Sequence, residues 1–328
     1  MRYIIYGAGA VGCVIGADLQ RSGQDVVFIG RGAHLAAMQA SGLTIQTPDE
    51  TFHLDVRAVG HPREIDFQAD DVVLLTMKTQ DTEAALEDLQ AAGGGRLPVV
   101  CAQNGVENER IASRRFEQVY TMVVWVPVTL EEPGLVLHHA SPVHGILDSG
   151  RYPTGSDALI EAVMSNLREA GYCADANPRL MRSKYTKLLA NLHTGLLGVC
   201  GLEGADASYT KRMRAEAEAC YEAAGIDAAS AEEEEARRVA CKFSGGRIEG
   251  RHALLGSVYQ SLMRGVGTIE TDFIHGEIVL MGAMHGVATP YCRALQWAAK
   301  EMANQKQQPG AYSVEDLERI ARDEYGAT

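Results

Sequence analysis

A lysine and an asparagine stand four residues apart in a predicted helix over residues 178–191. Lys187 and Asn191 share one face of that helix, because an α-helix turns once every 3.6 residues. Two leucines follow Lys187, so its ammonium is expected to be partly buried. Burial readies a lysine to give up a proton near neutral pH. The alternative is an ordinary polar pair on an exposed helix face.

Two more polar side chains could act with this pair. Ser257 lies in the segment 256–260, and Glu270 lies in the segment 267–276. A serine hydroxyl and a carboxylate could converge on a polar substrate, although neither residue is distinctive by itself. The histidines do not group, and no cysteine has a suitably spaced histidine and acid. We therefore predict no metal site and no cysteine nucleophile.

A glycine-rich turn opens the chain. An apolar strand over residues 2–6 runs into Gly7-Ala8-Gly9-Ala10-Val11-Gly12, and a helical pattern and a second apolar strand over 25–29 follow. This order within about thirty residues is typical of dinucleotide-binding domains, although glycines also occur in ordinary strand-to-helix turns. Gly7 would permit the tight turn, Gly9 the approach of a pyrophosphate, and Gly12 close packing of helix on strand. The phosphates would bind at the helix N-terminus.

The residue after the second strand indicates which dinucleotide binds. NAD-binding domains usually place an acid there to accept the ribose hydroxyls, whereas this chain has Arg31. A guanidinium suits a phosphate and cannot accept a hydrogen bond. We therefore expect NADP(H), the alternative being a solvent-exposed arginine without this role.

Two loops follow later strands of the same predicted sheet. Lys78 comes after the strand over 71–76, and Asn104 comes after the strand over 97–102. Open α/β sheets bind ligands at the carboxyl ends of their strands. Lys78 could contact a phosphate or a ribose, and Asn104 could donate to the cofactor or the substrate. A surface lysine and an Asn-Gly turn are the alternatives.

Composition limits the class of protein. The chain has 328 residues, 46% of them hydrophobic, and a net charge of −13, which disfavours nucleic acid and anionic membranes as partners. Seven cysteines without a C-x-x-C pair are interpreted as buried thiols in a reducing compartment, with no disulfide framework. We find no signal peptide or membrane span, so the expected location is cytoplasmic.

The hydrophobic pattern changes once along the chain. Strands and helices alternate through the first half, and residues 120–130 and 135–139 are expected to pair as a hairpin around Glu131–Gly134. A helix over 157–170 and a strand over 172–174 follow, and helical periodicity alone continues from Pro178. We predict an α/β dinucleotide-binding domain over 1–177 and a mainly α-helical domain over 178–328. The helical domain is compatible with a homodimer.

In this order and spacing, the motifs together resemble the ketopantoate reductases (2-dehydropantoate 2-reductases) over nearly the whole chain. The resemblance implies a Rossmann-type N-terminal domain, a helical C-terminal domain, and NADPH-dependent reduction of a 2-oxo acid to a 2-hydroxy acid. It implies that Lys187 is the general acid and that Glu270 orients the substrate or the lysine. The resemblance also implies that Asn191 and Ser257 bind the substrate and that Asn104 lies at the cofactor–substrate junction. Arg31 and Lys78 would contact the cofactor.

One of the chain's departures from the family lies near this set. The family often has a second asparagine eight residues after the lysine, where this chain has Gly195. Losing that donor would remove a polar contact to the substrate, so the identity of the oxo acid stays open. Ketopantoate is the favoured substrate. The alternatives are a different 2-oxo acid and a protein that senses NADP(H) without turnover.

Overall fold

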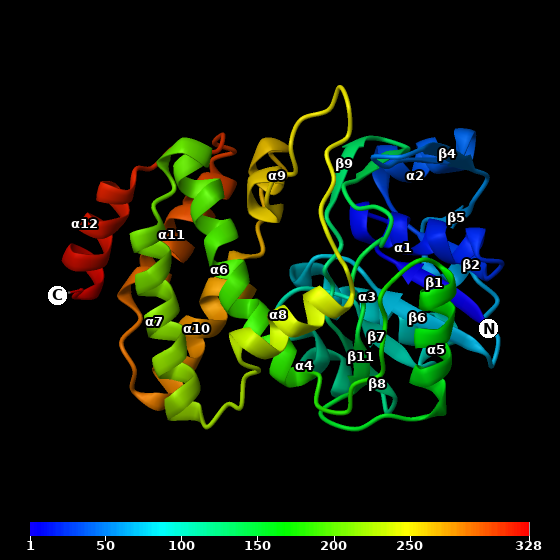
Figure 1. Ribbon diagram of the computed structural model, residues 1–328, viewed down its shortest axis with the longest axis horizontal. Helices are drawn as coiled ribbons and strands as arrows, with labels where there is room; N and C mark the ends of the chain where they lie inside the picture. The colour runs from blue at the N-terminus through cyan, green and yellow to red at the C-terminus, as the bar shows by residue number, and fades with distance from the viewer. Residues whose placement is uncertain (328) are drawn as a thin grey trace. The chain divides into compact units, whose positions relative to one another are not determined.

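The structure is a computed structural model that describes residues 1–327 and contains a seven-stranded sheet (Figure 1). Its strands are β1 (Arg2–Tyr6), β2 (Asp25–Ile29), β5 (Arg57–Val59), β6 (Asp71–Leu75), β7 (Val99–Cys101), β8 (Val119–Met122) and β11 (Ser149–Arg151). Their order is β11-β8-β7-β6-β1-β2-β5, and all neighbours are parallel except β8 and β11. The parallel strands end at one edge of the sheet, the edge at which open α/β sheets bind ligands.

Helices cover both faces of this sheet. On one face α1 (Ala10–Arg21) and α5 (Ala158–Glu169) share a core with Tyr3 and Ile5 of β1, and α2 (Gly32–Ser41) adds Met38. On the other face α3 (Thr82–Leu89) and α4 (Asn108–Ser113) share a core with Ile4. Successive residues of a strand point to opposite faces, so the central strands are buried on both sides. This burial explains their continuous apolar sequences.

A second, smaller sheet has the order β4-β3-β10-β9. Its strands are, in chain order, β3 (Leu43–Gln46), β4 (Thr51–Leu54), β9 (Val128–Glu132) and β10 (Leu135–His138). The predicted hairpin around Gly134 is confirmed for β9 and β10, which pair antiparallel. Its first strand was predicted too long, because residues 119–122 belong to the main sheet instead. Short helical turns η1 (Pro62–Glu64), η2 (Thr79–Asp81) and η3 (Gln90–Gly94) lie in the connections of the main sheet.

The chain folds into two compact units. The first unit comprises residues 1–183 and 230–254, and the second comprises 184–229 and the described residues from 255 on. The sequence-based ranges, 1–177 and 178–328, are contiguous and do not foresee the segment 230–254 in the first unit. This segment contains α8 (Ala231–Ala240) and, beyond it, Gly246, whose N–H donates to the carbonyl of His139 at 2.8 Å.

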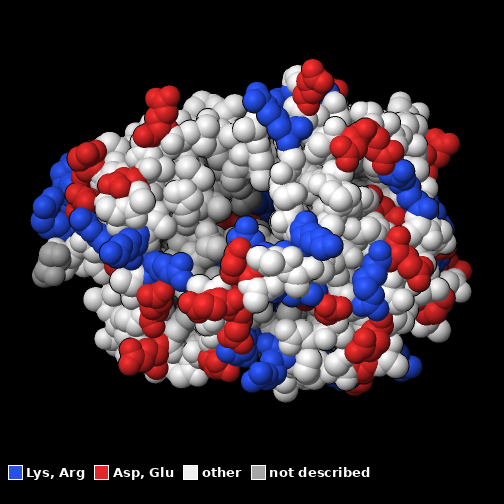
Figure 2. All heavy atoms as spheres, viewed as in Figure 1, with Lys and Arg blue, Asp and Glu red and all other residues white. Residues whose placement is uncertain are grey.

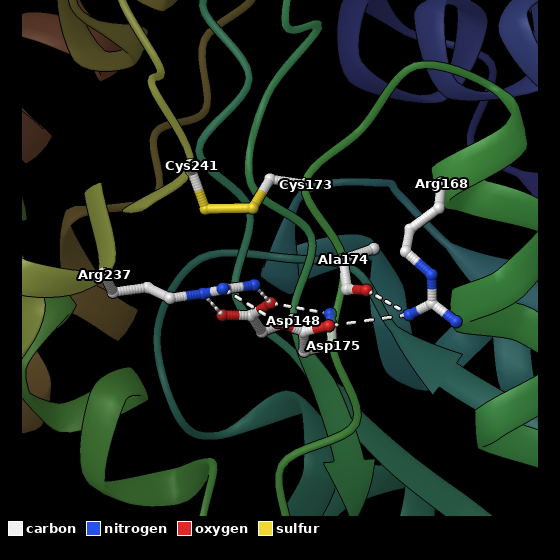
Figure 3. The surroundings of a disulfide bond; sticks show 7 residues. All are labelled: Asp148, Arg168, Cys173, Ala174, Asp175, Arg237 and Cys241. Atoms are coloured by element: carbon white, nitrogen blue, oxygen red, sulfur yellow. Dashed lines mark hydrogen bonds and ion pairs between the residues drawn. A yellow bond between two sulfur atoms is a disulfide. The ribbon is translucent and has the colours of Figure 1, made fainter. Parts of the chain in front are cut away.

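A disulfide anchors this segment within the first unit. It joins Cys173 to Cys241, the residue that follows α8 (Figure 3). Beside it, Arg237 of α8 donates to Asp148 at 2.7 Å and pairs with Asp175 at 2.8 Å. The expectation that all seven cysteines are thiols is therefore wrong for this pair, whereas the five others are buried thiols. Sequence spacing could not indicate a bond between residues 68 positions apart.

Among the described residues, every element of regular secondary structure in the second unit is a helix. Its helices are α6 (Met181–Gly204), which begins in the first unit, α7 (Ala207–Ala224), α9 (Ser257–Met263), α10 (Thr271–His285), α11 (Pro290–Asn304) and α12 (Val314–Tyr325). In α11 the buried positions Cys292, Leu295, Ala299 and Met302 recur every three or four residues, which forms one apolar face. The predicted fold class, an α/β Rossmann-type N-terminal part followed by a mainly α-helical C-terminal part, is confirmed.

The surface carries charges of both signs. On the face seen in Figure 2, lysines and arginines alternate with aspartates and glutamates instead of gathering in one patch. Within residues 1–327, no helix combines the length and the apolar character needed to cross a membrane.

Candidate active site

The glycine turn between β1 and α1 has the geometry that the sequence predicts. Gly7 has φ +105°, and a Cβ there would lie 2.7 Å from the Cα of Met77. A Cβ at Gly12 would lie 2.5 Å from the hydroxyl of Thr76, so this position allows α1 to approach the sheet. A Cβ at Gly9 would meet no atom nearer than 3.9 Å. The backbone at Gly9 is thus open to a ligand, as binding of a pyrophosphate requires.

The start of α1 can hold phosphate groups. Gly9 is its N-cap, no side chain caps it, and its first turn contains no acidic residue. The first N–H groups of a helix lack acceptors within it, and the helix dipole favours an anion there. Ala10 and Val11, the first helical residues, are partly exposed, while Ala8 is buried against Gly30. These residues fit the pyrophosphate of a dinucleotide.

Arg31 lies at the carboxyl end of β2, as the N-cap of α2. Its guanidinium is 83% exposed and donates to the Asp81 carboxylate at 2.7 Å. Asp81 belongs to η2, which follows β6, so the sequence near β2 held no signal for this contact. The pair places a cation and an anion side by side at the ligand-binding edge of the sheet.

Lys78 and Asn104 also lie at this edge. Lys78 is the N-cap of η2 after β6, and Asn104 lies in the loop after β7. The two strands are parallel neighbours, so both loops leave the sheet on the same side. The structure therefore brings the glycine turn, Arg31, Lys78 and Asn104 to one edge of one sheet.

A buried hydrogen-bond network ties these two loops together. Gln103 donates to the carbonyl of Met77 at 2.9 Å and to the hydroxyl of Thr82 at 2.8 Å. The Thr82 hydroxyl donates to Asn108 at 2.8 Å, and Asn108 donates to the carbonyl of Asn104 at 3.1 Å. Such buried polar networks order the loops that contain them. Sequence analysis missed Thr82 and Asn108, because a polar residue in a helical pattern does not reveal what it contacts.

The second unit contains the other candidate residues. Lys187 is only 7% exposed on α6, so the interpretation of an exposed polar pair is wrong for it. Asn191 follows one turn later, and its side-chain nitrogen is buried without a hydrogen-bond partner among the described residues. A buried donor without an acceptor costs about 1–3 kcal/mol, which an acceptor on a ligand can recover.

The other two candidate residues lie at the starts of α9 and α10. Ser257 is the first residue of α9, and a Cβ at the preceding Gly256 would lie 3.4 Å from the Cβ of Thr194 on α6. Glu270 is the N-cap of α10 and is 5% exposed. The second unit therefore carries its four candidate residues on three helices: Lys187 and Asn191 on α6, Ser257 on α9, and Glu270 on α10.

His275 occupies the space beside Gly195. A Cβ at Gly195 would lie 2.6 Å from Nε2 of His275 and 2.7 Å from the side chain of Leu295. Nε2 of His275 donates to the carbonyl of Leu192 at 3.0 Å. Burial lowers the pKa of His275 to about 4, against a smaller opposing effect of that hydrogen bond, so the ring is neutral at pH 7. A neutral imidazole thus fills the space that a side chain at position 195 would need.

This packing predicts the effect of a small substitution. Gly195→Ala should destabilise the protein by about 1–3 kcal/mol, because the new methyl group overlaps a fully buried ring. Gly204→Ala, also in α6, is the matched control, because a Cβ there meets nothing closer than 3.5 Å. Urea denaturation of both variants measures the difference. Equal stability of the two would mean that His275 moves away at little cost.

Family models match both parts of the chain. One described as ketopantoate reductase PanE/ApbA matches residues 3–153, and one for the C-terminal part of the same proteins matches residues 180–303. A curated relative, the 2-dehydropantoate 2-reductase of Archaeoglobus fulgidus, is 28% identical over 297 residues, which cover 90% of this chain and 95% of the relative.

Solved structures agree with these matches. A PanE/ApbA family ketopantoate reductase from Ralstonia eutropha has a TM-score of 0.76 at 26% identity, over 93% of this chain and 99% of its own. A D-mandelate dehydrogenase solved with NADH and anilino(oxo)acetate has a TM-score of 0.78 at 25% identity, over 93% of this chain and 99% of its own. The two family models together span most of the sequence, and the fold is that of the solved members. The chain therefore belongs to the ketopantoate reductase family, a family of oxidoreductases.

Proposed function

We propose that this protein reduces a 2-oxo acid, ketopantoate in the first instance, to the 2-hydroxy acid with NADPH. The observation that carries the proposal is the buried Lys187 with the side-chain nitrogen of Asn191 one turn away, for which residues 1–327 offer no hydrogen-bond acceptor. An ammonium and an amide donor on one face of a helix suit a carbonyl oxygen that gains negative charge. Family membership supports the reaction class.

Each candidate residue has a role in this proposal. The bound nicotinamide would supply a hydride to the carbonyl carbon. Lys187 stabilises the developing charge on the carbonyl oxygen and donates the proton, leaving a neutral amine. Asn191 and Ser257 donate hydrogen bonds to the substrate, and Glu270 orients the substrate or Lys187. Asn104 would contact both the cofactor and the substrate.

NADPH is the proposed cofactor because Arg31 takes the place of the usual acid after β2. We expect Arg31→Ala to weaken NADPH binding by about 10- to 100-fold, the cost of a lost hydrogen bond between charged groups, and to affect NADH far less. Dissociation constants for both cofactors, from the fluorescence of the bound nicotinamide, test this. Arg96→Ala is the control, because Arg96 is exposed and precedes β7, at the opposite edge of the sheet. Equal loss of both cofactors would mean that Arg31 does not contact the 2′-phosphate.

A related 2-oxo acid is the second candidate substrate. Gly195 lacks the amide that the family often has there, and the D-mandelate dehydrogenase resembles this chain over 93% of its length. NADPH oxidation should therefore be followed with ketopantoate beside a panel that includes an aryl 2-oxo acid. Preference for ketopantoate would support the first assignment. Turnover of another oxo acid alone would refute it and retain the reductase chemistry.

A further inference from the structure

The ion pair between Arg31 and Asp81 joins two loops that flank the glycine turn. In the strand order β6-β1-β2, Asp81 follows β6, the glycine turn follows β1, and Arg31 follows β2. All three strands are parallel, so their loops leave the same edge of the sheet. The contact of 2.7 Å between Nη2 and Oδ2 therefore connects the two sides of the dinucleotide-binding turn.

Fold stability does not explain this pair. The Arg31 side chain is 83% exposed and that of Asp81 is 33% exposed, and ion pairs this exposed contribute between zero and about 1 kcal/mol. Arg31 uses one N–H for Asp81, while a guanidinium has five. A ligand can thus bind both side chains, or replace one of them as the ion-pair partner of the other, with little loss of fold stability.

The two charges suit different forms of the cofactor. The ribose hydroxyls of NADH need an acceptor, which most NAD-binding domains supply as an acid at the end of the second strand. Here that position is Arg31, and the nearest acid in space is Asp81, from another loop. The 2′-phosphate of NADPH needs a cation and is repelled by a carboxylate.

We infer that Asp81 is a specificity residue for the cofactor. Its carboxylate accepts a ribose hydroxyl of NADH, and it weakens NADPH binding by repelling the 2′-phosphate and competing for Arg31. The protein then uses both cofactors, and Arg31 and Asp81 set their ratio in opposite directions. This inference rests on the proposed function only in assigning the dinucleotide to the glycine turn.

Asp81→Asn tests the inference, because it removes the charge and keeps the size of the side chain. NADPH should bind about fivefold more tightly once the repulsion is gone. NADH should bind about fivefold more weakly, since an amide oxygen is a poorer acceptor than a carboxylate. Equilibrium dissociation constants from nicotinamide fluorescence are the primary readout, with KM values in turnover beside them. Thermal melts establish that the variant is folded.

The control is Asp88→Asn, which makes the same charge change in α3, where Asp88 pairs with His61 at 3.5 Å. If Asp81→Asn changes both cofactors in the same direction, or no more than Asp88→Asn does, the inference is wrong. The result is independent of Arg31→Ala. If Arg31→Ala weakens NADPH far more than NADH while Asp81→Asn leaves the ratio of the two affinities unchanged, this inference alone is overturned. If Arg31→Ala weakens both cofactors equally, the NADPH assignment is overturned.

Discussion

Replacing Lys187 with alanine is expected to lower kcat by about 10²-fold or more, the usual loss when a general acid is removed. The affinity for NADPH should stay nearly unchanged, because Lys187 lies in the second unit and the glycine turn lies in the first. Stopped-flow turnover gives the rate, and nicotinamide fluorescence gives the binding.

Two further variants separate the roles of this lysine. Lys187→Arg keeps the positive charge but cannot donate its proton, since a guanidinium stays protonated in proteins. It should recover part of the charge stabilisation without restoring the wild-type rate. Lys211→Ala, an exposed lysine on α7, controls for loss of a positive charge. A Lys187→Ala rate within a few-fold of wild type would remove Lys187 from the mechanism. Binding of NADPH without turnover by the wild type would favour the sensing protein.

Loss of the disulfide between Cys173 and Cys241 is expected to lower the free energy of unfolding by about 4 kcal/mol. The bond closes a loop with a sequence separation of 68, and the entropy of a denatured chain with such a loop gives a value of this size. Urea denaturation of Cys173→Ser/Cys241→Ser, with and without dithiothreitol, measures the effect. The reductant should lower the free energy of unfolding of the wild type. It should leave that of the double variant unchanged, so the double variant is the control for other effects of the reductant.

Counting thiols tests the same bond without a variant. Alkylation of the denatured, unreduced protein should modify five cysteines, and alkylation after reduction should modify all seven. Seven modified cysteines without reductant would show that the isolated protein keeps this pair reduced. The disulfide would then contribute nothing to the stability of the isolated protein.

Local patterns were sufficient for much of the fold. The strands predicted over residues 2–6 and 25–29 coincide with β1 and β2, and the helix predicted over 157–170 differs from α5 by one residue at each end. Apolar periodicity and turn residues specify such elements because their cause lies within a few neighbouring positions. The glycine turn is likewise specified by neighbouring residues, since the need for positive φ at Gly7 is a property of the turn itself.

The sequence by itself determined the α/β-then-helical order, the dinucleotide turn, and the pairing of Lys187 with Asn191 on one helix face. Only the tertiary structure revealed the carboxylate of Asp81 beside Arg31, the ring of His275 in the space at Gly195, and the disulfide between Cys173 and Cys241 within the first unit. Each of these contacts joins residues 50 or more positions apart, as the separations of 50 and 68 for the ion pair and the disulfide illustrate. Periodicity describes one element at a time, whereas such contacts depend on how elements pack against one another.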